Sequence, residues 1–213
     1  TVTQRPDGAG DGGGGGVGRG AGAVHGGKAV VPAGRGWLKG YGTDGAGFIA
    51  ALLGRGVQVA DRRGCVFGAG GAARAIIDAL ARSGAKSITV INRSDDRAHE
   101  AAALAGAIGA VGTATDVGYS DIVINATSVG MGSADLPCEA AHLHGDLVVA
   151  DIVYHPRRPA LRAAADQVWA RIVEGLGMLV HQAVLQQQLW TGLKPDATVM
   201  SAAAERQLAV TGK

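Results

Sequence analysis

The run Gly68-Ala69-Gly70-Gly71-Ala72-Ala73 constrains the fold of this chain more than any other feature. It follows the apolar run CVF and opens a segment, residues 72–82, whose apolar side chains recur at helical spacing. Strand, glycine-rich turn and helix in this order form the phosphate-binding turn of dinucleotide-binding folds. Gly68 would allow the tight turn, Gly70 the approach of a pyrophosphate, and the helix N–H groups would hold the phosphates. The alternative is a glycine turn that only joins a strand to a helix.

The residues after the next predicted strand favour NADP over NAD. The strand SITVI ends at Asn92-Arg93-Ser94, where NAD-binding folds place an Asp or Glu about 20 residues after the turn. A carboxylate there would repel a 2′-phosphate, whereas the guanidinium groups of Arg93 and Arg97 would bind one. The two aspartates that follow Ser94 would begin a helix, where acids are favoured by the helix dipole. The alternative is a solvated, basic helix start.

Short apolar runs alternate with amphipathic segments from Gly64 onward. The runs are CVF, SITVI, DIVINA and LVVADIVY, and helices are predicted over residues 72–82 and 95–105. Helical periodicity returns over residues 177–190 and again after Pro195. This alternation predicts an α/β fold with a Rossmann-like, doubly wound parallel sheet.

Composition excludes several classes of protein. A net charge of +2 over 213 residues gives no electrostatic reason to expect nucleic acid or a membrane as a partner. Cys65 and Cys138 fit no metal-ligand spacing, so no metal site is predicted. No run approaches the roughly 20 apolar residues of a membrane span, and the start lacks a signal-peptide pattern. We therefore expect a cytoplasmic protein that binds a small ligand.

The first part of the chain is rich in glycine. The run Gly12 to Gly16 and the scarcity of apolar side chains predict disorder over residues 1–20. Residues 36–40, GWLKG, are predicted to form a short strand or hairpin arm. A helix is predicted over residues 43–53, with Asp44 in its first turn.

Six motifs carry a resemblance to a known family. GYGTDGAGF, VFGAGGAARA, INRSDDRA, INATSVGM, DIVYHP and GLGMLVHQA occur in the order and spacing of the C-terminal two-thirds of shikimate dehydrogenase, which the chain resembles from about residue 21 onward. The resemblance implies NADP-dependent, reversible reduction of 3-dehydroshikimate to shikimate, a step of aromatic amino acid and chorismate biosynthesis. Monomer and homodimer both remain open.

The resemblance also implies the roles of individual residues. Asp44 matches an aspartate that contacts substrate hydroxyls beside a catalytic lysine, and Tyr154 and Gln182 match positions near the substrate. A helix-capping acid, and side chains bonded to backbone, are the alternatives. Gly175 would allow close approach of the nicotinamide. The positions that match residues lining the cofactor are Asn125, Thr127, Ser128, Ile152, Gly175 and Met178.

The chain departs from the family near its start. The serine pair and the NVTxPxK segment with the catalytic lysine have no counterpart, and His25 and Gly26 replace an asparagine and a threonine. A divergent start and a truncated gene are both compatible with this leader. We expect cofactor binding to persist and turnover by this chain alone to be weak or absent. The alternatives are a non-catalytic NADP-binding protein and a quinate/shikimate dehydrogenase.

These observations predict four segments. They are a disordered leader (1–20), a remnant of a reduced or missing N-terminal substrate domain with its connecting helix (21–55), the NADP-binding domain (56–175), and C-terminal helices that pack back toward the substrate domain (176–213).

Overall fold

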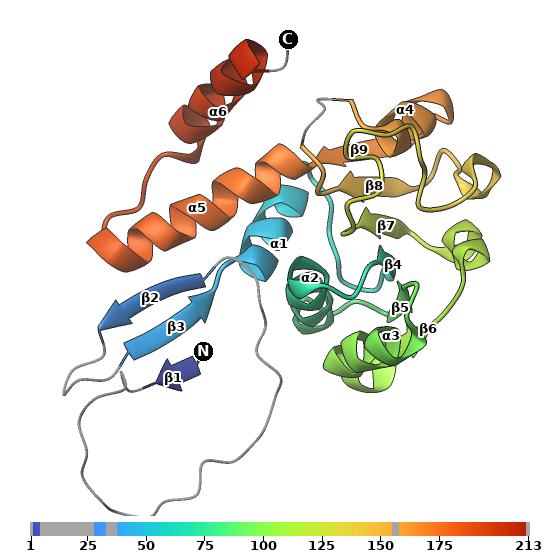
Figure 1. Cartoon of the computed structure of the whole chain (residues 1–213), viewed down its shortest axis with the longest axis horizontal. Coiled ribbons are helices and arrows are strands. Elements are labelled where there is room, and N and C mark those ends of the chain that lie inside the picture. Colours follow the sequence, from blue (N-terminus) through green and yellow to red (C-terminus); the bar gives the residue numbers. More distant parts are fainter. Residues whose placement is uncertain (1, 5–27, 33–37, 155–157, 212–213) are drawn as a thin grey trace, which may run out of the picture.

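A six-stranded parallel sheet forms the centre of the computed structural model, which describes residues 2–4, 28–32, 38–154 and 158–211 (Figure 1). Its strands lie in the order β6-β5-β4-β7-β8-β9, and every neighbouring pair is parallel. The strand order therefore reverses between β4 and β7, as in doubly wound nucleotide-binding sheets. The predicted Rossmann-like α/β fold is confirmed. The strands are β4 (Arg63–Phe67), β5 (Ser87–Ile91), β6 (Gly109–Val111), β7 (Ile122–Asn125), β8 (Val148–Asp151) and β9 (Arg171–Glu174).

Helices cover both faces of this sheet, and each face has its own apolar core. One core joins Phe48 and Leu52 of α1 to Ile76 and Leu80 of α2 and to the inward side chains of the strands. The other core packs α4, including Leu161, against the opposite face. The helices are α1 (Asp44–Gly54), α2 (Gly71–Arg82), α3 (Asp95–Ala102), α4 (Ala160–Gln167), α5 (Gly175–Thr191) and α6 (Ala197–Thr211), with short 3-10 turns η1 (Ala103–Ile108), η2 (Ala114–Tyr119) and η3 (Ala140–His142).

A small antiparallel sheet lies apart from the parallel one. Its strands are β1 (Val2–Gln4), β2 (Lys28–Pro32) and β3 (Leu38–Gly42), in the order β1-β3-β2. The prediction of disorder over residues 1–20 is wrong for Val2–Gln4, because these residues pair with β3; residues 1 and 5–20 lie outside the described part. The strand predicted over 36–40 is found two residues later, as β3, and residues 36 and 37 are not described.

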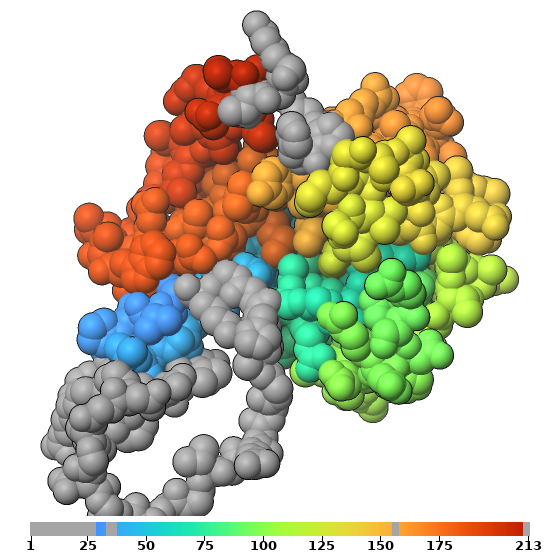
Figure 2. All heavy atoms as spheres, in the orientation of Figure 1, coloured from blue at the N-terminus to red at the C-terminus, as the bar shows by residue number. Residues whose placement is uncertain are grey.

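Helix α1 lies between α2 and α5, and two of its glycines make this possible. A Cβ on Gly45 would collide with the backbone oxygen of Ala75 in α2, and a Cβ on Gly47 would lie 2.7 Å from the backbone nitrogen of Gln182 in α5. The three helices therefore approach backbone to backbone. Figure 2 shows the consequence: α5 and α6 (orange to red) and strands β2 and β3 (blue) lie beside the body built from the βα units. Asp44, at the start of α1, is held next to α5.

Helices α1, α2 and α4 end in the same hydrogen-bonded motif, and after α4 the left-handed position of this motif is occupied by a tryptophan instead of a glycine. Gly56, Gly84 and Trp169 each adopt a positive φ (70°, 81° and 62°) just after the ends of α1, α2 and α4. At Trp169 the closing bonds run from Trp169 N–H to Asp166 O and from Ala170 N–H to Ala165 O. This pattern is a Schellman motif, whose left-handed position favours glycine. Trp169 is also 90% exposed, so packing contributes little there.

We therefore expect Trp169→Gly to stabilise the protein. Removing the Cβ from a left-handed position relieves about 1–2 kcal/mol of strain, and the added freedom of glycine in the unfolded chain takes back roughly half. Urea unfolding should show a net gain of about 0.5–1 kcal/mol. Gly84→Ala is the matched control and should destabilise the protein. A loss of stability in Trp169→Gly would show that the indole makes a contact that outweighs the strain.

Within the described ranges, no helix combines the length and the apolar character that a membrane crossing demands.

Candidate functional site

The carboxyl edge of the parallel sheet, at the point where the strand order reverses, is open at the start of α2. Gly70 caps this helix with φ −78°, no side-chain cap bonds to it, and its first turn contains no acid. A Cβ on Gly70 would meet no atom within 4 Å. The first N–H groups of a helix lack partners inside the helix and carry the positive end of its dipole. The start of α2 is therefore shaped to receive an anionic group.

Gly68 fixes the turn between β4 and α2, next to the start of α2. Its φ is +109°, and a Cβ there would lie 2.8 Å from the backbone oxygen of Ala126 in the loop after β7. Its N–H donates to Ile91 O at the end of β5. Because β4 lies between β5 and β7, the turn at Gly68 ties together the loops of three adjacent strands. Ala69, Gly71 and Ala72 of the same predicted turn line the start of α2.

The end of β5 presents the predicted basic residues to solvent. The side-chain amide of Asn92 donates to Ser94 O at 3.0 Å and closes the turn into α3. Arg93, Ser94 and Arg97 are exposed at this turn. Arg74, in α2, was not predicted; it forms an ion pair with Glu100 of α3 at 3.1 Å and so links the two helices.

The loop after β7 is shaped by the side chains of Asn125 and Thr127. Asn125 is fully buried, and its amide donates to Val129 O (3.1 Å) and to Asp151 Oδ1 (3.0 Å). Its carbonyl oxygen accepts bonds from the N–H (3.2 Å) and the hydroxyl (2.6 Å) of Thr127. With four bonds inside the protein, the Asn125 side chain can serve a ligand only by fixing the loop that carries Thr127 and Ser128. Ser128 itself is exposed.

Asp151, at the end of β8, is a buried acid that sequence reasoning missed. It is 5% exposed, and its Oδ1 accepts bonds from Asn125 and from the N–H of Val153 (3.0 Å). Among the described residues, Oδ2 has no hydrogen-bond partner. Burial raises the pKa of Asp151 to about 6, although the two bonds to Oδ1 oppose the shift. The available signal was an acid at the end of the otherwise apolar run LVVA.

Gly175 begins α5 directly above Asp151 and Ile152. A Cβ there would lie 2.5 Å from Ile152 O and 2.8 Å from Asp151 O. The protein's own backbone therefore already requires glycine at this position, whether or not a nicotinamide approaches it. Met178, one turn further, is buried and lines a small void together with Phe48 and Ile152.

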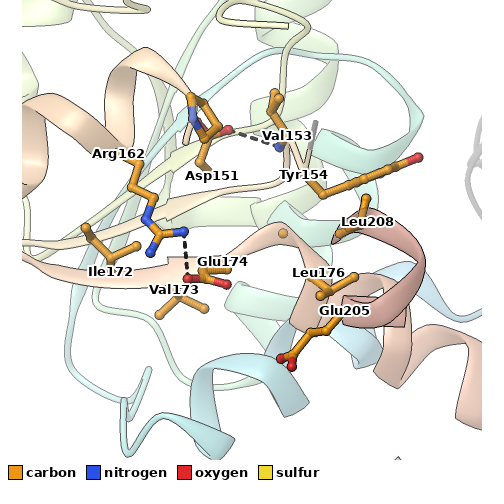
Figure 3. Close-up of a pocket in the computed structure, with 12 residues that line it drawn as sticks. Asp151, Val153, Tyr154, Arg162, Ile172, Val173, Glu174, Leu176, Glu205 and Leu208 are labelled. Atoms are coloured by element: carbon orange, nitrogen blue, oxygen red, sulfur yellow. Dashed lines mark hydrogen bonds and ion pairs between the residues drawn. The ribbon is translucent and has the colours of Figure 1, made fainter. Parts of the chain in front are cut away.

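A recess that is open to solvent lies where the loop after β8 meets α4, α5 and α6 (Figure 3). Tyr154 is 44% exposed and lines it beside Leu208 of α6. On the opposite side Arg162 of α4 forms an ion pair with Glu174 at 2.7 Å. Tyr154 thus lies in the loop after β8, and α4 and α6, which sequence reasoning did not place there, build much of its surroundings.

Asp44 and Gln182 lie close together at the crossing of α1 and α5. Asp44 is 9% exposed and follows Thr43, whose hydroxyl donates to Gln182 Oε1 at 3.3 Å. Gln186 donates from its amide to both Gln182 Oε1 (2.6 Å) and Thr43 Oγ1 (3.1 Å). The ring formed by Thr43, Gln182 and the unpredicted Gln186 therefore ties Gln182 to the residue that precedes Asp44.

Comparisons with known proteins agree with this arrangement. Residues 51–131 match the family model for shikimate / quinate 5-dehydrogenase, and residues 175–205 match that for the shikimate 5'-dehydrogenase C-terminal domain. The shikimate dehydrogenase (NADP(+)) of Thermococcus kodakarensis is 40% identical over 174 residues, which cover 80% of this chain and 62% of that protein. The chain belongs to the shikimate dehydrogenase family.

Solved structures of shikimate dehydrogenases and related reductases share the fold. The shikimate 5-dehydrogenase of Thermus thermophilus in complex with NADP(H) and shikimate is 32% identical, with a TM-score of 0.77, and the match covers 83% of this chain and 66% of that one. The ligand-free 5-ketofructose reductase of a Gluconobacter species is 37% identical, with a TM-score of 0.73, over 81% of this chain and 65% of that one. The chain spans about three-fifths of the length of the curated family members it matches.

The predicted site residues of this family member fall into two neighbouring groups along the carboxyl edge. The first group surrounds the starts of α2 and α3 and the loop after β7. The second lies around the start of α1 and the first half of α5 and includes Asp44, Gln182 and, in the recess beside α5, Tyr154. No cluster of three or more potential metal ligands occurs within the described ranges.

Proposed function

We propose that this chain binds NADP across the carboxyl edge of its parallel sheet and takes part in the reversible reduction of 3-dehydroshikimate to shikimate. The observation that carries the proposal is the open, glycine-capped start of α2 at the reversal of strand order, with Arg93 and Arg97 exposed at the end of the adjacent strand. It is supported by relatives named shikimate dehydrogenase (NADP(+)) and by the Thermus structure with NADP(H) and shikimate.

The donor set fits NADP on three counts. A Cβ on Gly70 would meet no atom of the other described residues within 4 Å, so this position leaves space for a pyrophosphate to approach the N–H groups of α2. No acid stands in the first turn of α2 to repel it. At the end of β5, where an acid would mark NAD, the chain has Arg93, which suits a 2′-phosphate. NADPH would supply the hydride for the reduction and NADP+ would accept it in the reverse direction, while the protein would supply position and hydrogen bonds.

Asp44 and Gln182 would bind the substrate. A carboxylate accepts hydrogen bonds from hydroxyl groups, and the amino group of an amide donates to an oxygen, so the pair suits a polyhydroxylated ring. Tyr154 would complete this side from the loop after β8. We further propose that this chain alone converts the substrate slowly, because its sequence contains no NVTxPxK segment to supply the family's catalytic lysine.

A second candidate is a reductase for another polyhydroxylated ketone. The similarity to 5-ketofructose reductase favours it. So does Gly42, which replaces the asparagine of the family's NTDG motif beside Asp44; a Cβ at Gly42 would meet no atom within 4 Å, so this position leaves space. A non-catalytic NADP-binding protein remains the third candidate, and cytoplasmic location and the choice between monomer and homodimer remain predictions of the sequence.

The test combines binding and turnover in one preparation. NADPH binding is titrated by fluorescence, and NADP reduction is followed with shikimate, with quinate and with a reduced keto-sugar. Turnover with shikimate supports the first proposal, turnover only with the keto-sugar supports the second, and tight binding without turnover supports the third. Asp44→Asn is the control: it should reduce turnover at least tenfold while the dissociation constant for NADPH stays within about twofold.

Arg93 and Arg97 should decide between NADPH and NADH. We expect the double substitution Arg93→Ala/Arg97→Ala to weaken NADPH at least 100-fold, because each charge-assisted bond to a phosphate contributes about 1.5–3 kcal/mol. NADH, which lacks the 2′-phosphate, should lose less than about threefold. Competitive titration of both cofactors measures the ratio, with the exposed Arg55→Ala as the matched control. Equal weakening of the two cofactors would refute the phosphate role.

A further inference from the structure

Helix α5 carries three consecutive glutamines, of which only Gln186 contacts a predicted site residue. Gln187 and Gln188 are exposed, and neither side chain forms a hydrogen bond to another described residue. Gln186 is partly buried and donates both of its amide hydrogens, one to Thr43 Oγ1 (3.1 Å) and one to Gln182 Oε1 (2.6 Å). Its role is therefore different from that of its two neighbours.

The contacts of Gln186 determine which way the Gln182 amide points. A carboxamide oxygen accepts two hydrogen bonds, and Gln182 Oε1 receives both, from Gln186 and from the Thr43 hydroxyl (3.3 Å). The reversed amide would set the NH₂ of Gln182 against the NH₂ of Gln186. Oε1 is thus directed toward the start of α1, and both of its acceptor positions are occupied.

The amino group of Gln182 lies on the other side. One of its hydrogens is donated to Leu179 O at 3.1 Å, one turn nearer the start of α5. Within the described part of the chain, no residue accepts the second hydrogen. Gln182 therefore keeps one free donor, and Gly47 lets α1 approach so closely that Gln182 is held at the helix crossing.

We infer that Gln186 is a positioning residue that orients Gln182 so that it offers the substrate a hydrogen-bond donor and no acceptor. The inference rests on the proposed function, in which Gln182 faces the substrate. It adds a rule of selectivity: Asp44 accepts from a hydroxyl group of the ligand, whereas Gln182 donates to an oxygen of the ligand, either a hydroxyl or a carboxylate. A ligand that presents only an N–H or another donor to Gln182 is disfavoured.

The orientation can be tested without any ligand. In a ¹⁵N-labelled chain, the side-chain amide hydrogens of Gln186 should exchange with solvent at least tenfold more slowly than those of Gln187, because both are donated within the protein. Gln186→Ala should shift the side-chain resonances of Gln182, whereas Gln187→Ala should leave them unchanged. If Gln186 exchanges as fast as Gln187, or if Gln186→Ala leaves Gln182 unchanged, the inference is overturned whatever the chain binds.

The selectivity is tested with NADP present and shikimate as the ligand. Gln186→Ala should raise the dissociation constant and KM for shikimate about tenfold with kcat changed less than threefold, and Gln186→Glu should raise them further, because the introduced carboxylate would attract the Gln182 amino group and turn Oε1 to the ligand. NADPH affinity should stay constant.

A double-mutant cycle separates positioning from general stability. In a Gln182→Ala background, Gln186→Ala should have no further effect on shikimate affinity. Additive effects would overturn the inference. If the parent chain binds NADPH but not shikimate, while the exchange experiment shows the predicted protection, the orientation of Gln182 stands and the proposed substrate is the part that fails.

Discussion

Gly70→Val should abolish measurable binding of NADPH and of NADH while the protein remains folded. The substituted side chain would occupy the space above the start of α2, where a Cβ meets no protein atom within 4 Å. Gly70 has φ −78° and ψ −173°, an extended conformation that valine adopts readily. We expect the free energy of unfolding to change by less than about 0.5 kcal/mol. Both cofactors carry the pyrophosphate, so both should weaken at least 100-fold.

Gly68→Ala is the matched substitution two residues earlier, and it should act on the fold instead. Its positive φ and the 2.8 Å approach to Ala126 O leave no room for a methyl group. We expect a loss of stability of about 2–4 kcal/mol, from the backbone conformation and the steric clash together. Urea unfolding and cofactor titration of both variants check the pair. A Gly70→Val protein that binds NADPH normally would place the pyrophosphate elsewhere and refute the proposed site.

Comparison with the arginine variant shows what each measurement contributes. Loss of Arg93 and Arg97 should separate NADPH from NADH, whereas Gly70→Val should not. The two results together would place the 2′-phosphate at the end of β5 and the pyrophosphate at the start of α2. Those two points are enough to orient the whole cofactor along the carboxyl edge, with its nicotinamide toward Gly175 and Asp44.

Much of the central sheet could be predicted because its signals are local. An apolar run next to a glycine turn and an amphipathic helix identifies a βα unit: β5 was predicted with its exact bounds, α2 within one residue and β4 within two. Strands β6 and β9 were missed because each is short, with three and four residues, and only partly buried. Helix α4 was missed because it is short, with eight residues, and buries only Leu161 and Ala165.

The site was only partly predictable, because its groups meet across long distances in the sequence. Family motifs predict a role for Asp44 and Gln182, but the ring of Thr43, Gln182 and Gln186 joins residues more than 130 positions apart, and no periodic pattern in the sequence indicates it. The burial of Asp151 likewise depends on strand order, which puts β8 between β7 and β9. The pairing of Val2–Gln4 with β3 could not be expected from three residues in a glycine-rich leader.

Asp151→Asn should change how stability depends on pH. The pKa of Asp151 is raised to about 6 in the folded protein, from an ordinary value of 3.8. Between these values the folded state holds a proton that the unfolded state has released, so this group stabilises the protein fully below about pH 4. That stability is lost as the pH rises through 6, and a shift of about two units corresponds to roughly 3 kcal/mol.

Asparagine cannot ionise, so the variant should lose this dependence. Its oxygen can still accept the bonds from Asn125 and Val153, but its amino group would stand where Oδ2 has no partner among the described residues, at a constant cost of about 1 kcal/mol. We expect the wild type to be the more stable protein at pH 4 and the variant to be the more stable one at pH 8.

Urea unfolding at one-unit steps from pH 4 to pH 8 measures the difference between the two proteins, in which the titration of all other groups cancels. Asp121, whose pKa is lowered to about 2 by its bond to Arg63, adds a slope only near pH 4, where the unfolded state begins to bind a proton, and this slope is the same in both proteins. Asp146→Asn, at an exposed acid a few residues away, is the matched control and should run parallel to the wild type. Parallel curves for Asp151→Asn as well would mean that water or a ligand already satisfies the carboxylate. A crossing of the curves would instead show that the protein gives up stability at neutral pH to keep a charged group between the loops that carry Thr127 and Tyr154, as is common where a fold serves a binding site.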